Sequence, residues 1–152
     1  MAYCSGGVRA VTHSEPLMFG PMTFVLRRID QPTWVARALS VDPALLVALQ
    51  RDSGAFWNVT RTESETSIVS SLEDHPSFLS VEGPWSVFRI EGTLDFALTG
   101  VLAGFSGLLA EANVSVFAVS TFDTDYFLVP AKKTDAAVAA WTNAGIEVRD
   151  FQ

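Results

Sequence analysis

The feature that most constrains the fold of this chain is a hairpin pattern that occurs twice. Residues 59–65, with the sequence VTRTESE, are matched sixty positions later by residues 119–125, with the sequence VSTFDTD. Each segment leads from a β-branched run through an acidic turn into a second apolar run, which predicts two strands joined by a turn. A looser match of residues 26–30 to residues 87–91 predicts a strand ahead of each hairpin. The chain is therefore predicted to contain two copies of one small unit.

The composition favours a folded protein without a nucleic-acid or membrane partner. The 152 residues are 49% hydrophobic, which is enough for a sizeable core in one compact body or two very small ones. The formal net charge is −7 and the ten Lys and Arg residues are scattered, whereas a phosphate backbone needs clustered basic residues. The uncharged stretch 96–110 is shorter than the roughly twenty residues of a membrane helix, so we expect a buried helix there.

The few reactive side chains predict neither a metal site nor a catalytic step. Cys4 has no cysteine partner, and His13 and His75 stand apart from each other and from any thiol, so we expect no metal, no cofactor and a cytoplasmic location. No G-x-S-x-G motif or other nucleophile motif is present, which argues against an enzyme. Residues 1–16 lack the basic start and apolar stretch of a secretory signal and are predicted to be a weakly structured lead-in.

The first unit is predicted to cover residues 17–82. It begins with a strand at 24–29, continues with a helix that starts at Asp42-Pro43 and stops at Ser53-Gly54, and ends with the first hairpin. Residues 72–84 contain two prolines and a glycine. We expect a linker there, with one helical turn near 77–79.

The second unit is predicted to cover residues 83–152. After a strand at 85–91, apolar residues recur at three-and-four spacing from Phe96 to Ala112, which predicts a helix capped by Asp95 or Thr93. The second hairpin, a helix at 133–143 and a strand at 146–149 follow. The order β-α-β-β-α-β is that of a ferredoxin-like unit, so the fold class is predicted to be α+β, with tandem units, antiparallel sheets and helices on one face.

Two stretches of the second unit resemble the ACT-domain family: residues 94–103, LDFALTGVLA, and residues 108–126, LLAEANVSVFAVSTFDTDY. More narrowly, the chain is similar to small bacterial tandem ACT proteins whose domains resemble those of the cytosolic arginine sensors of the TOR pathway. The resemblance is close over residues 85–148 and looser over residues 24–81. It implies a regulatory protein that binds an amino acid, has no catalytic activity and assembles as a homodimer through its sheets.

The resemblance also implies a location for the ligand. In the arginine sensors the ligand lies between ACT units, against a helix start and an S-T-F-x-x-D turn, which here gives Thr121, Phe122 and Asp125. An acidic residue that helps to hold the ligand in those sensors is replaced by Leu98. Its loss removes a charge-assisted hydrogen bond of about 1.5–3 kcal/mol, which disfavours arginine as the ligand.

The residues themselves support the same location. A free amino acid presents one carboxylate and one ammonium. The predicted helix start, with Asp95, Thr99 and Gly100, is expected to supply unpaired N–H groups for the carboxylate. Asp123 and Asp125 are placed to receive the ammonium, although an aspartate in a turn also commonly bonds its own backbone.

The sequence thus predicts a tandem ACT protein with an amino acid bound at the junction of its two copies or of two chains. The alternative is a structural or adaptor module that pairs chains through its sheet edges. In that case side chains such as Leu98 and Phe122 would fill the space in which the ligand is expected to bind.

Overall fold

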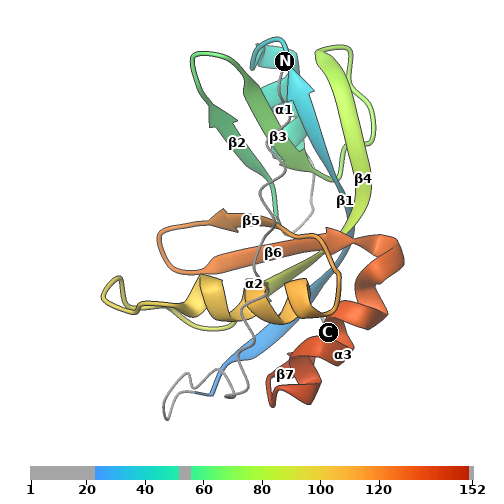
Figure 1. The fold of residues 1–152 in the computed structure, drawn as a ribbon. Helices are drawn as coiled ribbons and strands as arrows, with labels where there is room; N and C mark the ends of the chain where they lie inside the picture. The colour runs from blue at the N-terminus through green and yellow to red at the C-terminus, as the bar shows by residue number, and fades with distance from the viewer. Residues whose placement is uncertain (1–22, 52–55, 151–152) are drawn as a thin grey trace, which may run out of the picture.

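A computed structural model describes residues 23–51 and 56–150 of the chain. The predicted lead-in at residues 1–16 and the predicted helix stop at Ser53-Gly54 lie outside the described residues. Two long antiparallel strands, β1 (Val25–Ala38) and β4 (Phe78–Ile90), run side by side through the molecule and connect an upper half to a lower half (Figure 1).

The strands form a single curled sheet in the order β2-β3-β1-β4-β6-β5, and β7 adds to β1 in parallel. All the other pairs are antiparallel, which confirms the predicted α+β class with an antiparallel sheet. The remaining strands are β2 (Asn58–Arg61), β3 (Thr66–Ser70), β5 (Phe117–Ser120), β6 (Asp125–Pro130) and β7 (Glu147–Arg149). The two segments predicted as first strands are direct neighbours, since Leu26 pairs with Ile90 and Ile29 pairs with Val87.

The upper half holds the short helix α1 (Pro43–Arg51), which starts where Asp42 and Pro43 predict. The backbone N–H of Leu45 donates to Oδ1 of Asp42 at 2.9 Å, and the hydroxyl of Ser77 donates to Oδ2. These two bonds, the Ser77 bond first, lower the pKa of the Asp42 carboxyl because they favour its charged form. Leu45 and Leu49 of α1 pack on buried residues of β1 and β3.

The lower half contains the helices α2 (Val101–Glu111) and α3 (Thr134–Asn143), the latter after a 3-10 turn at Ala131–Lys133. Their apolar faces cover an aromatic core in which Trp141 is fully buried. The Trp141 ring meets Phe88 edge to face at 4.9 Å, and its Nε1–H donates to the carbonyl of Phe105 at 3.3 Å. Because a buried indole N–H needs an acceptor, this bond fixes α3 relative to α2.

A second cluster on the opposite face of the sheet joins the two halves. Phe56 comes from the upper half and stacks on Tyr126 of the lower half, with ring centroids 4.2 Å apart. Val87 belongs to this cluster while its neighbour Phe88 belongs to the aromatic core, as expected for the alternation of side chains along a strand.

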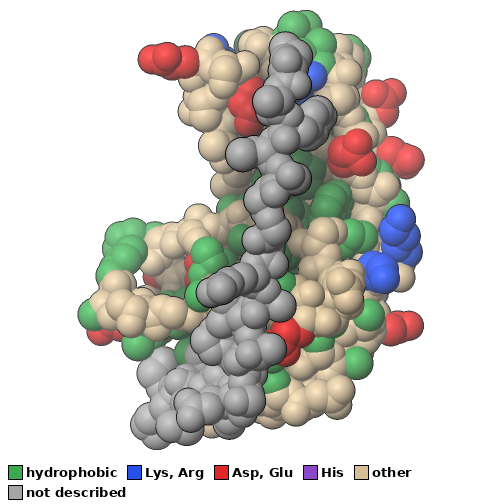
Figure 2. Space-filling model, viewed as in Figure 1, with side chains coloured by type: hydrophobic (Ala, Val, Ile, Leu, Met, Phe, Trp, Pro, Cys, Tyr) green, Lys and Arg blue, Asp and Glu red, His purple; other side chains and the backbone are tan. Residues whose placement is uncertain are grey.

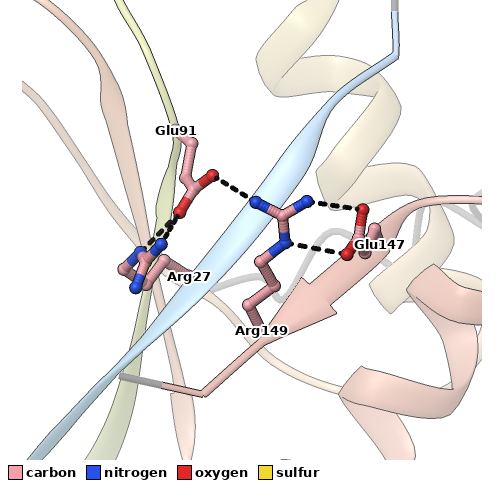
Figure 3. A network of polar contacts seen from close by, with 4 residues as sticks. All are labelled: Arg27, Glu91, Glu147 and Arg149. Carbon is pink, nitrogen blue, oxygen red and sulfur yellow. Dashed lines mark hydrogen bonds and ion pairs between the residues drawn. The ribbon is translucent and has the colours of Figure 1, made fainter. Parts of the chain in front are cut away.

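An ion-pair network secures the last strand of the described chain (Figure 3). Glu91, just after β4, contacts Arg27 of β1 and lies 3.2 Å from Nη1 of Arg149 in β7. Arg149 also holds Glu147 with two hydrogen bonds of 2.7 and 3.0 Å, which lower the pKa of the Glu147 carboxyl. Three strands therefore meet at the point where the chain leaves β4 for the loop before α2.

Two predicted elements were wrong. The segment 72–84 is not a linker with a helical turn, because Phe78 begins β4 and the strand continues through Gly83 and Pro84. The helix predicted from Phe96 begins only at Val101, since Gly100 adopts φ +81°, outside the helical region. None of the helices in the described part of the chain has the length and hydropathy that a membrane-spanning helix requires.

Candidate functional site

A cavity of about 590 Å³ opens in the lower half of the molecule between three segments: the loop after β4, the start of α2 and the β5–β6 turn. Its volume is within the range of about 300–1,000 Å³ that is usual for small-molecule sites. In Figure 2 hydrophobic side chains surround a recess on the left of the molecule, over the region where Figure 1 draws these segments. The lining residues are Leu94, Asp95, Phe96, Leu98, Gly100, Val101, Leu102, Ala103, Ser106, Ser120, Thr121, Phe122, Asp123, Thr124 and Asp125.

Two threonines build the β5–β6 turn. The N–H and the hydroxyl of Thr121 both donate to the carbonyl of Thr124 at 2.9 Å. The hydroxyl of the buried Thr124 donates to the carbonyl of Ile90 at 2.8 Å, so the turn is anchored to the end of β4. The N–H of Leu94 donates to the carbonyl of Asp123 at 2.7 Å and joins the turn to the next loop. These hydrogen bonds fix the β5–β6 turn against the end of β4 and the loop that follows it.

The loop before α2 forms its own turn. Oδ1 of Asp95 accepts from the N–H of Ala97 at 2.8 Å, and the Asp95 carbonyl accepts from the N–H of Leu98 at 2.9 Å. Asp95 therefore caps this turn and not the helix. The start of α2 carries no side-chain cap, unlike the start of α1 at Asp42. Residues 100–103 line the cavity, so the positive end of the helix dipole borders it.

The charges around the cavity are all negative. Of the described residues, Asp95, Asp123 and Asp125 line it, and none of the described Lys, Arg or His residues does. Oδ1 of Asp125 accepts from the hydroxyl of Ser120 at 2.6 Å, whereas the exposed carboxylate of Asp123 makes no hydrogen bond within the described chain. The described residues contain no cluster of His, Cys, Asp and Glu placed to hold a metal ion. The arrangement is suited to a positively charged group.

Two exposed phenylalanines stand at the mouth of the cavity. Phe96 and Phe122 are 77% and 78% exposed, and their rings meet edge to face at 5.1 Å with an interplanar angle of 78°. Large exposed aromatic groups are uncommon on a protein surface unless something contacts them. Leu98 and Leu102 extend the apolar surface into the cavity.

The structure brings together most of the residues predicted to bind the ligand. Asp95, Gly100, Thr121, Phe122, Asp123 and Asp125 line the one cavity, while Thr99 does not. Every described lining residue lies between positions 94 and 125, so the described part of this cavity belongs to the second predicted copy and not to the junction of the two copies, which was one of the two locations expected. A site between two chains stays a prediction. Phe96 was not among the predicted ligand-binding residues, because its spacing is typical of a helix that faces a core.

The two hairpins have the same turn. The N–H of Thr62 donates to the carbonyl of Glu65 at 2.9 Å, as the N–H of Thr121 does to that of Thr124. Asn58 at the start of β2 corresponds to Phe117 at the start of β5, so the structural offset is 59 residues and not the 60 of the sequence match. The first turn borders a smaller hollow of about 270 Å³ that contains two arginines and two glutamates.

Comparisons with known proteins agree with this fold. The family model for the ACT domain matches residues 80–143. A crystal structure of an Agobacterium tumefaciens protein is 28% identical with a TM-score of 0.72, and the alignment covers 86% of this chain and 96% of that one. No curated protein matches the chain in sequence.

More distant solved structures share the fold. A Vibrio cholerae protein of unknown function, described as a possible transport protein, is 15% identical with a TM-score of 0.62, and the alignment covers 80% of this chain and 90% of that one. The ligand-free regulatory subunit of aspartate kinase from Thermus thermophilus is 12% identical with a TM-score of 0.53, over 76% of this chain and 93% of that one.

Proposed function

We propose, starting from the ACT-domain match over residues 80–143, that this chain is a regulatory protein that binds an amino acid and catalyses no reaction. The observation that carries the proposal is the cavity beside α2, where six of the seven residues predicted to contact a ligand come together. A cavity lined by a few convergent polar groups on an apolar background is the usual form of a small-molecule site.

Each end of a free amino acid has a counterpart in this cavity. Asp123 and Asp125 would receive the ammonium, and the backbone N–H groups at the start of α2 would receive the carboxylate. The start of α1 supports this assignment, because there the protein's own carboxylate, Asp42, occupies the helix end. At α2 no side chain takes that place.

The proposal includes a tandem origin of the fold. The six-stranded order β2-β3-β1-β4-β6-β5 places corresponding strands at equal distances from the central β1–β4 pair, and the two hairpin turns share one hydrogen-bond pattern. We assign the units to residues 17–82 and 83–152. The first unit contributes a strand to the second, since Leu26 in the first half of β1 and the preceding Phe24 pack in the lower core.

The assembly and the location follow from the same reasoning. Strands β2 and β5 end the main path of the sheet, and unpaired strand edges favour pairing between chains. We therefore propose a homodimer in the cytoplasm that responds to ligand by a change in association. With ten basic and seventeen acidic residues, nucleic acid is not among the proposed partners.

The competing function is an adaptor module without a ligand. The exposure of Phe96 and Phe122 favours it, because two such rings could equally pack against another protein. The open volume of about 590 Å³ favours ligand binding, since Leu98 and Phe122 line the cavity without filling it.

Thermal melting in the presence of each of the twenty amino acids tests the proposal. A ligand at one hundred times its Kd adds about 2.7 kcal/mol of stability. For a chain of this size that amounts to a rise of about 5–11 °C in the melting temperature. An Asp125→Ala protein should lose most of this response, whereas Glu63→Ala, an exposed acidic residue in the turn of the other hairpin, should keep it. The proposal fails if no amino acid raises the melting temperature, or if both variants respond like the wild type.

A further inference from the structure

The charged residues that line the cavity come from only two of its three segments. The acidic groups gather where the loop after β4 meets the β5–β6 turn, because the Leu94 N–H bonds the Asp123 carbonyl and brings Asp95 beside that turn. The end of the loop and the start of α2 contribute lining residues without charge, among them Leu98, Val101 and Leu102, whereas Leu94, Phe96 and Phe122 are apolar neighbours of the aspartates in the chain. The described residues thus give the cavity an acidic end, at Asp95 and the β5–β6 turn, and an uncharged apolar wall along the start of α2.

From this arrangement we infer that the site selects a ligand whose ammonium is attached to the same carbon atom as an apolar side chain, as in leucine. The inference rests on the proposed function and specifies its ligand. The ammonium lies against Asp123 and Asp125, and the apolar body lies on Leu98 and Leu102. Phe96 and Phe122, both exposed at the cavity, cover that apolar body.

The same geometry disfavours ligands with a charged side chain. A carboxylate side chain would enter a cavity whose titratable lining residues are all aspartates, and like charges repel at short range. A basic side chain, with its ammonium held at the acidic end, would place its second positive charge on the apolar wall. None of the described acidic residues lines the cavity there, and the positive end of the α2 dipole opposes a cation.

An ammonium beside an apolar group has two chemical sources, a free amino acid or the amino terminus of a peptide. The two differ in the carboxylate, which only the free amino acid presents next to the ammonium. The uncapped start of α2 would distinguish them, since its N–H groups are available to a carboxylate.

Isothermal titration calorimetry of the full chain with five probes tests the inference. The probes are L-leucine, L-leucinamide, 4-methylpentanoate, L-glutamate and L-arginine. We expect leucine to bind, and 4-methylpentanoate, glutamate and arginine each to bind at least about tenfold more weakly. If leucinamide binds with an affinity within tenfold of that of leucine, the site recognises the amino terminus of a peptide. If leucine binds and leucinamide does not, the site recognises a free amino acid.

The results that overturn the inference differ from those that overturn the proposed function. Tighter binding of glutamate or arginine than of leucine would refute the apolar selectivity. Equal binding of 4-methylpentanoate would refute the ammonium contact with Asp123 and Asp125. Either result would leave binding of an amino acid standing. The absence of binding by any amino acid would refute both.

A matched pair of variants gives a second readout. Leu102 in α2 and Leu46 in α1 are both 41% exposed on the first turns of their helices, and only Leu102 lines the cavity. Leu102→Asp should weaken leucine about tenfold and raise the affinity for arginine, because it places a carboxylate on the apolar wall. Leu46→Asp should change neither. Equal leucine affinity in the two variants would refute the assignment of the wall.

Discussion

The hydroxyl of Thr124 is the clearest single anchor of the cavity, and its removal gives a prediction with a defined magnitude. Thr124 is 6% exposed, and its Oγ1–H donates to the Ile90 carbonyl at 2.8 Å. Thr124→Val keeps the shape of the side chain and leaves the backbone hydrogen bonds to Thr121 in place. It removes only the donor to a buried carbonyl.

A buried carbonyl that loses its partner costs about 1–3 kcal/mol. At about 2–4 °C per kcal/mol for a chain of this length, the melting temperature should fall by about 2–12 °C. Urea denaturation followed by circular dichroism measures the change in free energy of unfolding, with an unchanged m-value as the sign that the denatured state is unaffected. The variant should also bind its amino acid more weakly, because the turn that carries Asp123 and Asp125 would be held less firmly.

Thr60→Val is the control for this experiment. Thr60 is exposed on β2, and its hydroxyl donates to Oδ1 of Asn58 at 3.0 Å in contact with solvent. Its loss should change the free energy of unfolding by no more than about 0.5 kcal/mol. If Thr124→Val is as stable as the wild type, or loses no more than Thr60→Val, the turn is not anchored through this bond and the reasoning is wrong.

Three further predictions concern stability. Trp141→Ala should lower the free energy of unfolding by about 3–5 kcal/mol, because the indole is fully buried in the aromatic core; urea titration measures it. Asp42, whose pKa is lowered chiefly by Ser77, stabilises the fold above its unfolded pKa near 3.8 and loses that effect as the pH falls through the lower folded pKa. The stability difference between wild type and Asp42→Asn should therefore shrink below pH 3.8 in thermal melts. Gly83→Ala should destabilise the fold in the same melts, since φ is +155° and a Cβ would lie 2.7 Å from Cδ1 of Trp34.

Each of these has a control in the same chain. Trp57 is 40% exposed, and Trp57→Ala should cost clearly less than Trp141→Ala. A Cβ at Gly92 would have no described atom within 4 Å, so Gly92→Ala tests the effect of positive φ alone. It should lower the stability less than Gly83→Ala does. Equal losses within either pair, or a difference between wild type and Asp42→Asn that stays constant from pH 7 to pH 3, would contradict the packing or the titration described above.

The sequence predicted best those elements that depend on neighbouring residues. Both hairpins formed as expected because their turns are built by local threonine and backbone bonds, at Thr62 and at Thr121. The start of α1 was equally clear, since Asp42 and Pro43 are local signals for a helix start.

Elements that depend on distant partners could not be predicted. Residues 78–84 read as a linker because of their Gly and Pro, but they pair along β1, where Ser80 lies opposite Arg37. The neighbouring residues do not indicate which distant strand this segment pairs with. The partner of β7 could not be predicted for the same reason; it pairs with β1 and not with β4.

The helix boundary was missed for a different reason. Phe96 has the spacing of a helical core residue, yet Asp95 caps a separate turn and the helix begins only after Gly100. That error also explains why the exposed aromatic pair of Phe96 and Phe122 was not anticipated. The S-T-F-x-x-D turn is compact, so Asp123 and Asp125 lie together beside the cavity, and their role in binding a ligand stays a prediction.

The most direct test of the central claim is the location of the ligand on the protein. We suggest a titration of the ¹⁵N-labelled chain, followed by backbone amide NMR, with the amino acid that gives the largest rise in melting temperature. The predicted result is a set of shifts concentrated in residues 94–106 and 120–125. Shifts concentrated instead in the first hairpin turn, at residues 62–66, or around the Phe56–Tyr126 stack between the halves would contradict the claim.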